Sequence, residues 1–292
     1  MTVPSAAGSG TLDQSPRRAG RRSPTRSLRT PAPIVASAVL LAIMGPAFAQ
    51  DEPPGGGPRP SVSAEADGWV ASPSGWIFIT RGSQPGTATR AHDGREFGLD
   101  SEVLPAAEAW VRFWESHALG FRIVPAEESG THTASEGFIY HGQAYAAGRE
   151  IHSDVGFLLA DIDYQYRWEV SADVTLTPHA GAEYWGFSSH LRTVDALPPV
   201  DEKRSFSSAY WLAGADLEAG LTPWLRAQAL LLGGITGSTR YFVEANAGLA
   251  FRPASWASVS LLYRFHEVRF HTSTNEADLL FHGPSAGLEL RF

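Results

Sequence analysis

The last segment of the chain, residues 279–292, alternates in polarity at every second position. From position 280 onward, one side of the alternation is largely apolar and ends on an aromatic residue: Leu280, His282, Pro284, Ala286, Leu288, Leu290 and Phe292. The other side is mostly small or charged: Phe281, Gly283, Ser285, Gly287, Glu289 and Arg291. A period of two is the side-chain period of a β-strand. The segment therefore restricts the fold to a sheet whose apolar face is covered by a core or by lipid.

The same alternation recurs upstream, which predicts that strands build the whole fold. The candidate strands occupy residues 75–80, 107–113, 119–124, 154–168, 173–188, 206–219, 224–235, 240–251, 257–266 and 279–292. About ten strands, with eight or twelve as the neighbouring counts, match the even number found in bacterial single-chain membrane barrels. The longer segments reach the roughly 9–11 residues that a tilted strand needs to cross a bilayer.

The connections between these segments alternate in length. The short ones are residues 115–117, 169–172, 220–223 and 252–255. The longer ones are residues 81–103, 125–152, 189–205 and 270–279, with residues 236–239 as a short exception. Because consecutive antiparallel strands turn at opposite ends of a sheet, the short turns are expected at one end and the long connections at the other.

The amino terminus has the features of an export signal. Residues 1–33 contain six arginines and one aspartate, and an apolar run follows over residues 34–48. The run is short for a membrane-spanning helix, and Ala47-Phe48-Ala49 has the small-x-small pattern of a signal-peptidase site. We therefore expect a signal peptide over residues 1–49, cleaved after Ala49; an uncleaved anchor is the alternative. Residues 50–68 begin Pro- and Gly-rich and are expected to form a disordered linker.

Composition excludes several classes of protein. The chain has a formal net charge of −8, and six of its 23 basic residues precede position 50. An acidic mature chain argues against nucleic-acid binding. The chain has no cysteine, which excludes a disulfide framework and a lipoprotein anchor. After position 49 no apolar run approaches the length of a spanning helix, so a membrane location would require a closed barrel.

A terminal strand that ends in Phe292, strands with one apolar face and turns of alternating length together resemble small bacterial outer-membrane β-barrel proteins, in the broad class of the outer-membrane protein A barrel domain. The resemblance covers about residues 69–292. It implies a closed antiparallel transmembrane barrel in the cell outer membrane, with short periplasmic turns and longer outer loops. It also implies outer-membrane lipid and the barrel-assembly machinery as partners, Phe292 as an assembly signal, and no cofactor.

Aromatic residues lie near both ends of the candidate strands. Trp168, Trp224 and Trp256 adjoin short turns, and Tyr241 and Phe265 lie near the opposite ends. This distribution resembles the two interfacial girdles of membrane barrels. In the register used here, Trp224 and Trp256 fall on the lumen side.

The face opposite the apolar one carries the charges. The residues expected in the lumen are Glu108, Arg112, Arg122, Asp161, Asp163, Arg167, Glu183, Asp216, Glu218, Arg226, Glu244, Arg264, Glu289 and Arg291, with His179 and His266. A barrel of about ten strands is narrow enough for side chains to fill, so these residues predict a salt-bridged network that largely plugs the lumen. If the last strand closes onto the first ones, Glu289 and Arg291 are expected to meet Arg264 and Glu108. The expected role is structural or interactive and non-enzymatic, with a narrow pore for ions or small solutes as an alternative.

A membrane-embedded hydrolase is the other alternative. The segment His271-Thr272-Ser273 resembles the His-x-Ser-Asn motif of lipid A deacylases. This resemblance would make His271 the base and Ser273 the nucleophile. The match lies in a loop and the Asn is shifted by one residue, so no catalytic residue is predicted beyond these two candidates.

A protease of the omptin type would need paired aspartates and an Asp–His pair at the outer strand ends. The residues available there are Asp93, Asp100, His141, Asp154 and His190, and no motif joins them. The histidines are not spaced like a known ligand set, so no metal is expected. A secreted soluble barrel or sandwich, with the apolar face as its core, is the structural alternative.

Overall fold

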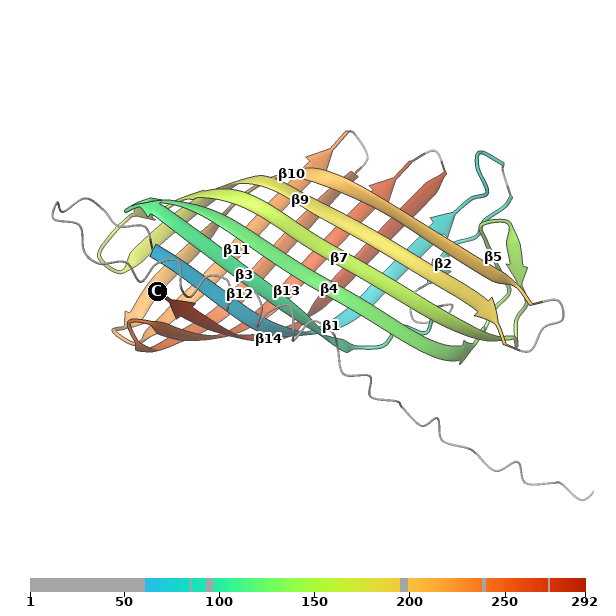
Figure 1. The fold of residues 1–292 in the computed structure, drawn as a ribbon, viewed down its shortest axis with the longest axis horizontal. Helices are drawn as coiled ribbons and strands as arrows, with labels where there is room; N and C mark the ends of the chain where they lie inside the picture. Colours follow the sequence, from blue (N-terminus) through green and yellow to red (C-terminus); the bar gives the residue numbers. More distant parts are fainter. Residues whose placement is uncertain (1–60, 85, 93–96, 195–198, 238–239, 273) are drawn as a thin grey trace, which may run out of the picture. The chain divides into compact units, whose positions relative to one another are not determined.

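The computed structural model describes residues 61–84, 86–92, 97–194, 199–237, 240–272 and 274–292 (Figure 1). Every described residue belongs to one compact unit. The expected signal peptide, its cleavage site and residues 50–60 lie outside the described residues. In the part of the chain that the structure describes, no helix is long and apolar enough to cross a membrane.

Ten long antiparallel strands close into one barrel (Figure 1). They are β1 (Ser61–Ile79), β3 (Glu102–Trp114), β4 (His117–Thr133), β7 (Glu150–Tyr166), β9 (Val174–Thr193), β10 (Asp201–Thr222), β11 (Leu225–Thr236), β12 (Arg240–Ala254), β13 (Ala257–His271) and β14 (Asn275–Arg291). Each strand pairs with its neighbours in chain order, and β1 pairs with β14 to close the sheet. The fold predicted from the alternation is confirmed, with ten strands.

Four short strands decorate the barrel. β2 (Ala91–His92) pairs with β1, and β8 (Trp168–Glu169) pairs with β9. β5 (Phe138–Tyr140) and β6 (Gln143–Tyr145) form a separate hairpin in the connection between β4 and β7. This hairpin lies at the end of the barrel opposite the carboxyl terminus (Figure 1).

The first strand is longer than the sequence predicts. β1 begins at Ser61, so residues 61–68, expected in the linker, form the first half of a membrane strand. Ser63 pairs with Arg291 and Trp69 with Ser285, which closes the barrel along the length of both strands. The apolar side of this half consists of small residues such as Ala64 and Ala66. Because alanine adds little hydropathy, the alternation is weak there.

The two ends of the barrel differ as expected, with corrections to the loop boundaries. The four short turns and the end of β14 lie together at one end. At the other end the strands run further than predicted, so the connections shrink to residues 134–149 and 194–200. The expected long connection over residues 270–279 is wrong: it is a tight turn in which Thr272 donates its amide to the carbonyl of Asn275 at 2.7 Å. The strands continue beyond the apolar belt with polar outward residues, so the apolar alternation ends before the strands do.

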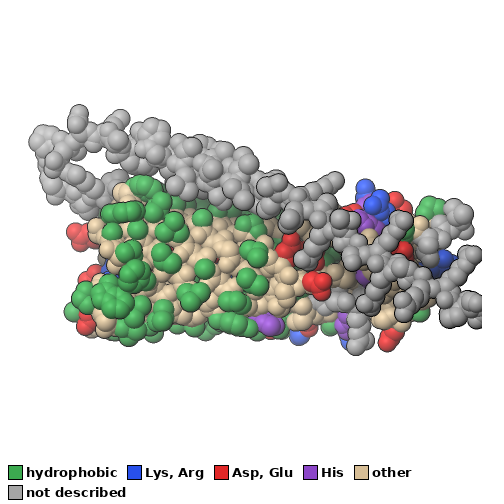
Figure 2. Space-filling view, turned by 90° about the horizontal axis from the view of Figure 1, so that it is seen from below, with side chains coloured by type: hydrophobic (Ala, Val, Ile, Leu, Met, Phe, Trp, Pro, Cys, Tyr) green, Lys and Arg blue, Asp and Glu red, His purple; other side chains and the backbone are tan. Residues whose placement is uncertain are grey.

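A belt of exposed apolar side chains surrounds the half of the barrel nearer the short turns (Figure 2). Its larger members include Phe121, Ile162, Tyr184, Trp211, Leu217, Leu231, Leu249, Phe251, Leu261 and Leu288. Apolar exposure on this scale marks a surface that contacts lipid. Trp224 and Trp256, assigned to the lumen in the predicted register, instead lie in turns with 51% and 61% of their surface exposed. Turn residues do not continue the alternation of the strands, which is why the register misplaced them.

The interior of the outer half is an aromatic core. Trp185 stacks on Phe187, Phe206 packs against both rings, and Phe270 stacks on Phe206. From the strands next to the closure, Phe281 packs edge-on against Trp69 and Phe157. The alternation predicts charged residues throughout the lumen, whereas the outer half of the interior is apolar.

The outer mouth is covered by the β5–β6 hairpin and the connection between β1 and β3. Tyr140 bonds to the Ser189 hydroxyl at 2.5 Å, and Tyr145 donates to the Leu191 carbonyl at 3.3 Å. Phe97, from the connection, packs edge-on against Tyr140 and is fully buried. Burial raises the pKa of the Tyr140 phenol, so it stays protonated and can donate this bond.

Closure of the barrel at Gly283 generates a prediction. Gly283 has φ of +153°, and a Cβ at this position would lie 1.9 Å from the Val70 carbonyl oxygen. Gly283→Ala should therefore lower the free energy of unfolding by about 1–3 kcal/mol through backbone strain alone, with the steric overlap adding to this. The measurement is urea unfolding in lipid vesicles.

Gly233→Ala is the matched control, because a Cβ there meets its nearest atom at 3.7 Å, an ordinary contact. Equal unfolding curves for the two variants would contradict the close approach of β14 to β1.

Candidate functional site

Arg122 holds the centre of a buried charge cluster halfway through the lumen. Its Nε donates to Asp161 Oδ2 at 2.6 Å on the adjacent strand β7. Its two terminal nitrogens donate to the two oxygens of Glu244 at 2.5 and 2.7 Å. Glu244 lies on β12, on the far wall of the barrel. The bidentate pair therefore spans the lumen and joins opposite walls.

Arg264, on β13, is the second cation of this cluster. It donates to Asp67 of β1 at 2.8 Å and lies 3.5 Å from Glu244 and 3.9 Å from Glu108. Its guanidinium also lies over the Trp69 ring, 5.3 Å from the centroid, a favourable cation–π geometry. Arg264 thus connects the closing strand to the cross-lumen pair.

His266 and Glu183 complete the cluster on its outer side. His266 Nδ1 lies 3.5 Å from Glu244, and its Nε2 lies 3.7 Å from Glu183. Glu183 Oε2 is also 3.6 Å from Arg122. Both side chains are almost fully buried, with at most 3% of their surface exposed.

A second set of charges lies nearer the short-turn end. Glu218 accepts from Arg226 at 2.8 Å and from Arg252 at 3.3 Å, while Arg291 pairs with Glu289 at 2.7 Å. Between the two sets, Asp163 bonds to His179 at 2.5 Å. Arginines therefore dominate this level of the lumen, in contrast to the acidic middle.

A cavity of about 390 Å³ separates these levels. It extends from residues of the short-turn end, such as Ser61 and Ser116, to Arg122 and Arg264 at its floor. The aromatic core lies beyond that floor. The lumen thus consists of a polar cavity, a charged layer and an apolar layer in series.

The structure places the predicted lumen residues on the inner surface. Those that line the cavity are Glu108, Arg112, Arg122, Asp161, Asp163, Arg167, Asp216, Glu218, Arg264, Glu289 and Arg291. Glu183, Glu244 and Arg226 make ion pairs with members of that set. The expected meeting of Glu289 and Arg291 with Arg264 and Glu108 is wrong in part: Arg264 lies near Glu108, but Arg291 pairs with Glu289 on its own strand.

Three charged residues of the lumen were not predicted from the sequence: Glu65, Asp67 and Arg252. Glu65 and Asp67 were assigned to the linker, and Arg252 was assigned to a turn. Glu65 accepts from Ser260 at 2.8 Å, and Asp67 binds Arg264. The alternation of Ser63, Glu65, Asp67 and Trp69 with small residues was the signal that could have revealed them.

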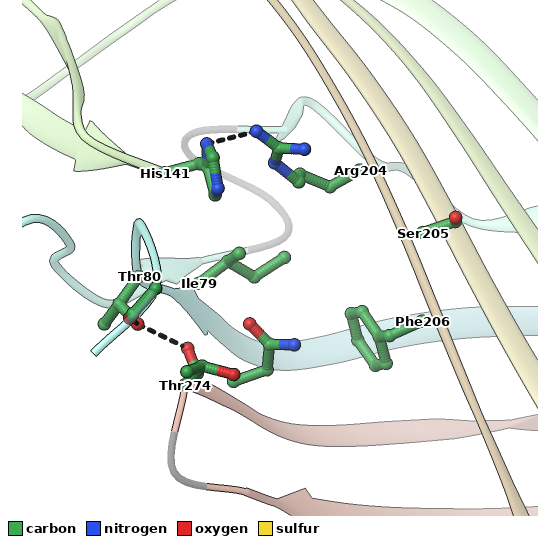
Figure 3. A pocket seen from close by; sticks show the side chains of 9 residues that line it. Ile79, Thr80, His141, Arg204, Ser205, Phe206 and Thr274 are labelled. Carbon is green, nitrogen blue, oxygen red and sulfur yellow. Dashed lines mark hydrogen bonds between the residues drawn. The ribbon is translucent and has the colours of Figure 1, made fainter. Parts of the chain in front are cut away.

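The outer end carries a smaller pocket of about 200 Å³ (Figure 3). His141 and Arg204 point toward one another on one side of it and form a hydrogen bond. Thr80 donates to the Thr274 carbonyl at 2.9 Å on another side. Burial and the positive charge of Arg204 lower the pKa of His141 below its usual value.

The lipid A deacylase candidates are not brought into a described site. His271 Nδ1 lies 3.0 Å from Glu276 Oε1, across the tight turn between β13 and β14. Ser273 lies outside the described residues.

The residues considered for an omptin-type site are dispersed. Asp154 and His190 pair at 3.3 Å on the outward face of β7 and β9, and His190 also binds Asp201 at 2.8 Å. Asp100 instead donates its amide to Glu128, and Asp93 lies outside the described residues. Of the five residues considered, Asp154 and His190 are thus the two that pair with each other, and their side chains are turned away from the lumen.

Comparison with known proteins informs the fold. No family model and no curated protein matches the chain. The solved structure of the outer membrane protease OmpT from Escherichia coli aligns with a TM-score of 0.54 and 7% identity, over 80% of this chain and 97% of that one. Ail, the attachment invasion locus protein of Yersinia pestis, aligns with a TM-score of 0.37 and 10% identity, over 81% of this chain and 100% of that one. The first likeness shows that this chain has the fold of an outer-membrane β-barrel protein.

The cross-lumen cluster generates a stability prediction. Arg122→Met removes the partner of Glu244 and Asp161 and leaves both carboxylates buried. The expected loss of unfolding free energy is about 3–5 kcal/mol, the usual cost of removing one partner of a buried ion pair. Arg122→Lys should lose less, because the charge remains while the bidentate geometry is lost.

Arg269→Met is the control for this prediction. Arg269 pairs with Asp278 at an exposed outer position, with 47% of its side chain accessible, so its loss should cost at most about 1 kcal/mol. Urea unfolding in vesicles compares the variants. Indistinguishable midpoints for Arg122→Met and Arg269→Met would contradict a structural role for the cluster.

Proposed function

We propose that this chain is a bacterial outer-membrane barrel that acts as a structural or interaction protein rather than as a conduit. The observation that carries the proposal is the filled outer half of the lumen. Trp185, Phe187 and Phe206 pack together there, beyond the charged layer around Arg122. An ion that entered the inner cavity would have to displace both layers to cross.

The charged layer around Arg122 and Arg264 is a second barrier to passage through the lumen. Arg122 and Arg264 are held by short contacts to Glu244, Asp161 and Asp67 at 2.5 to 2.8 Å. A solute would have to break several charge-assisted bonds in a setting with little water, where each is strong. The hairpin that carries Tyr140 and Tyr145 adds a cover at the outer mouth.

An outer-membrane location is supported by the fold, by the apolar belt and by the sequence features at residues 1–49. OmpT and Ail, the compared proteins, are described as an outer membrane protease and an attachment protein. Outer-membrane lipid and the barrel-assembly machinery are the proposed partners, with Phe292 as the assembly signal.

Single-channel recording in planar bilayers tests the closed lumen. Wild-type protein should insert without stable conductance steps. A triple variant, Arg122→Ala with Trp185→Ala and Phe187→Ala, removes one cation and two rings and should give measurable steps. Heat-modifiable migration on gels establishes that each preparation is folded. Reproducible steps from folded wild-type protein would favour the narrow pore instead.

Fractionation with intact-mass analysis tests location. Full-length protein expressed in a Gram-negative host should appear in the outer-membrane fraction, and its mass should correspond to a chain that begins at Gln50. Replacing Ala47 and Ala49 by bulky residues should leave the signal peptide attached, because signal peptidase needs small side chains there. A wild-type chain that is soluble without detergent would exclude the outer-membrane proposal.

A further inference from the structure

Three ligand-type side chains converge behind the floor of the inner cavity. Glu183, Glu244 and His266 come from β9, β12 and β13. One ligand atom from each lies within 4.8 Å of the others, and all three residues have at most 2% of their surface exposed. Glu244 also anchors Arg122 in the plug described above, whereas Glu183 accepts no hydrogen bond from any described residue.

Two of the three side chains have unused donor or acceptor atoms. Among the described residues, neither oxygen of Glu183 has a hydrogen-bond partner, nor does Nε2 of His266. These atoms face one another, with Glu183 Oε1 3.7 Å from His266 Nε2. Buried polar groups in native proteins are almost always satisfied, so something should occupy the position between them.

The side chains around Glu183 and His266 carry more negative than positive charge. Within the described residues, the middle of the lumen gathers Arg122 and Arg264 against a larger set of carboxylates: Glu65, Asp67, Glu108, Asp161, Glu183 and Glu244. Buried carboxylates that lack a compensating charge are strongly unfavourable. Bound protons or a cation must therefore supply the positive charge that the guanidinium groups of Arg122 and Arg264 do not provide.

We propose that this position holds a divalent transition-metal ion of the zinc type. Glu183 and His266 Nε2 would be its principal ligands, and Glu244 would be the third. Tetrahedral bonds of about 2.1 Å place ligand atoms about 3.4 Å apart, close to the 3.7 Å between Glu183 Oε1 and His266 Nε2. A donor set that includes imidazole suits zinc better than calcium or magnesium, which prefer oxygen ligands alone.

The surrounding contacts would orient these ligands. Arg122 donates to both oxygens of Glu244, which fixes that carboxylate and leaves lone pairs for a metal. The Phe242 ring stacks on His266 with centroids 5.7 Å apart and restricts the imidazole plane. Tyr210 lies directly across from Glu183 in the strand register. The site is thus built from several walls of the barrel rather than from one flexible segment.

Access to the site constrains how it would be filled. Arg122 lies between the inner cavity and Glu183, so a metal would enter during folding or past a displaced Arg122. Exchange from folded protein is therefore expected to be slow. The inference goes beyond the closed-lumen proposal and does not rest on it: conductance could appear while the metal remained bound.

The test is metal content after refolding. Unfolded full-length protein is refolded into detergent with Zn²⁺, separated from free metal by gel filtration and analysed by atomic emission. Wild type should retain about one equivalent. Glu183→Gln and His266→Gln keep the size of each side chain and should each lower Zn²⁺ affinity at least tenfold, with folding verified by gel migration.

The control is His190→Gln, which removes a half-buried histidine on the outward face of β9, paired with Asp154 and Asp201. It should leave the bound equivalent unchanged. Metal lost from His190→Gln but retained by His266→Gln would assign the site to the outer surface and overturn the proposal. Wild-type protein without bound zinc would overturn it as well and would indicate protons as the balancing charge.

A measurement on the wild-type protein alone tests the metal site even if a variant does not fold. Refolding with Co²⁺ should give visible absorption of the intensity typical of four- or five-coordinate cobalt with a nitrogen ligand. Only weak, six-coordinate absorption would contradict the site, as would displacement of the ion by millimolar Ca²⁺.

Discussion

The pairing of β1 with β14 is the constraint on which the rest of this structure depends. In a bilayer every backbone amide and carbonyl must find a partner within the protein, because lipid offers none. The register from Ser63 opposite Arg291 to Ile79 opposite Asn275 supplies those partners at the only place where the sheet could remain open. The close approach at Gly283 belongs to the same closure.

The chemistry of the lumen follows from that closure. Pairing β1 with β14 brings Glu65 and Asp67 beside residues that lie about two hundred positions later, such as Ser260 and Arg264. The first strand thereby adds two acids to a lumen that the later strands had already made acidic. Residues of the arginine-rich level line the same cavity as these two acids. Glu65 lies opposite Glu289 in the strand register, whereas Asp67 binds Arg264.

The sequence predicted the barrel well and its contents only partly. Alternation along residues 206–266 located four strands because each carries large apolar residues on one face. It missed the first half of β1, where Ala64 and Ala66 replace them. The inward aromatic residues of the outer half, such as Trp185 and Phe187, were not recognised as a separate layer, because hydropathy alternation cannot report height along the barrel axis. Partners such as Arg122 and Glu244 come from opposite walls, and no local pattern encodes that distance.

Apolar side chains fill the outer half of this lumen, so apolar side chains suffice to fill a lumen of this width. Replacing buried ion pairs by well-packed apolar residues is often neutral or stabilising, so stability alone does not account for a charged middle. Arg122 and Arg264 account for three of the carboxylates around them through hydrogen bonds to Asp161, Glu244 and Asp67. Glu183 is different: it is fully buried, it is more than 3.5 Å from Arg122 and His266, and its oxygens accept no hydrogen bond from the described residues. A glutamine would pack in that position as well as the carboxylate of Glu183 does. The property that distinguishes Glu183 is therefore its negative charge, and a buried negative charge needs a positively charged ligand.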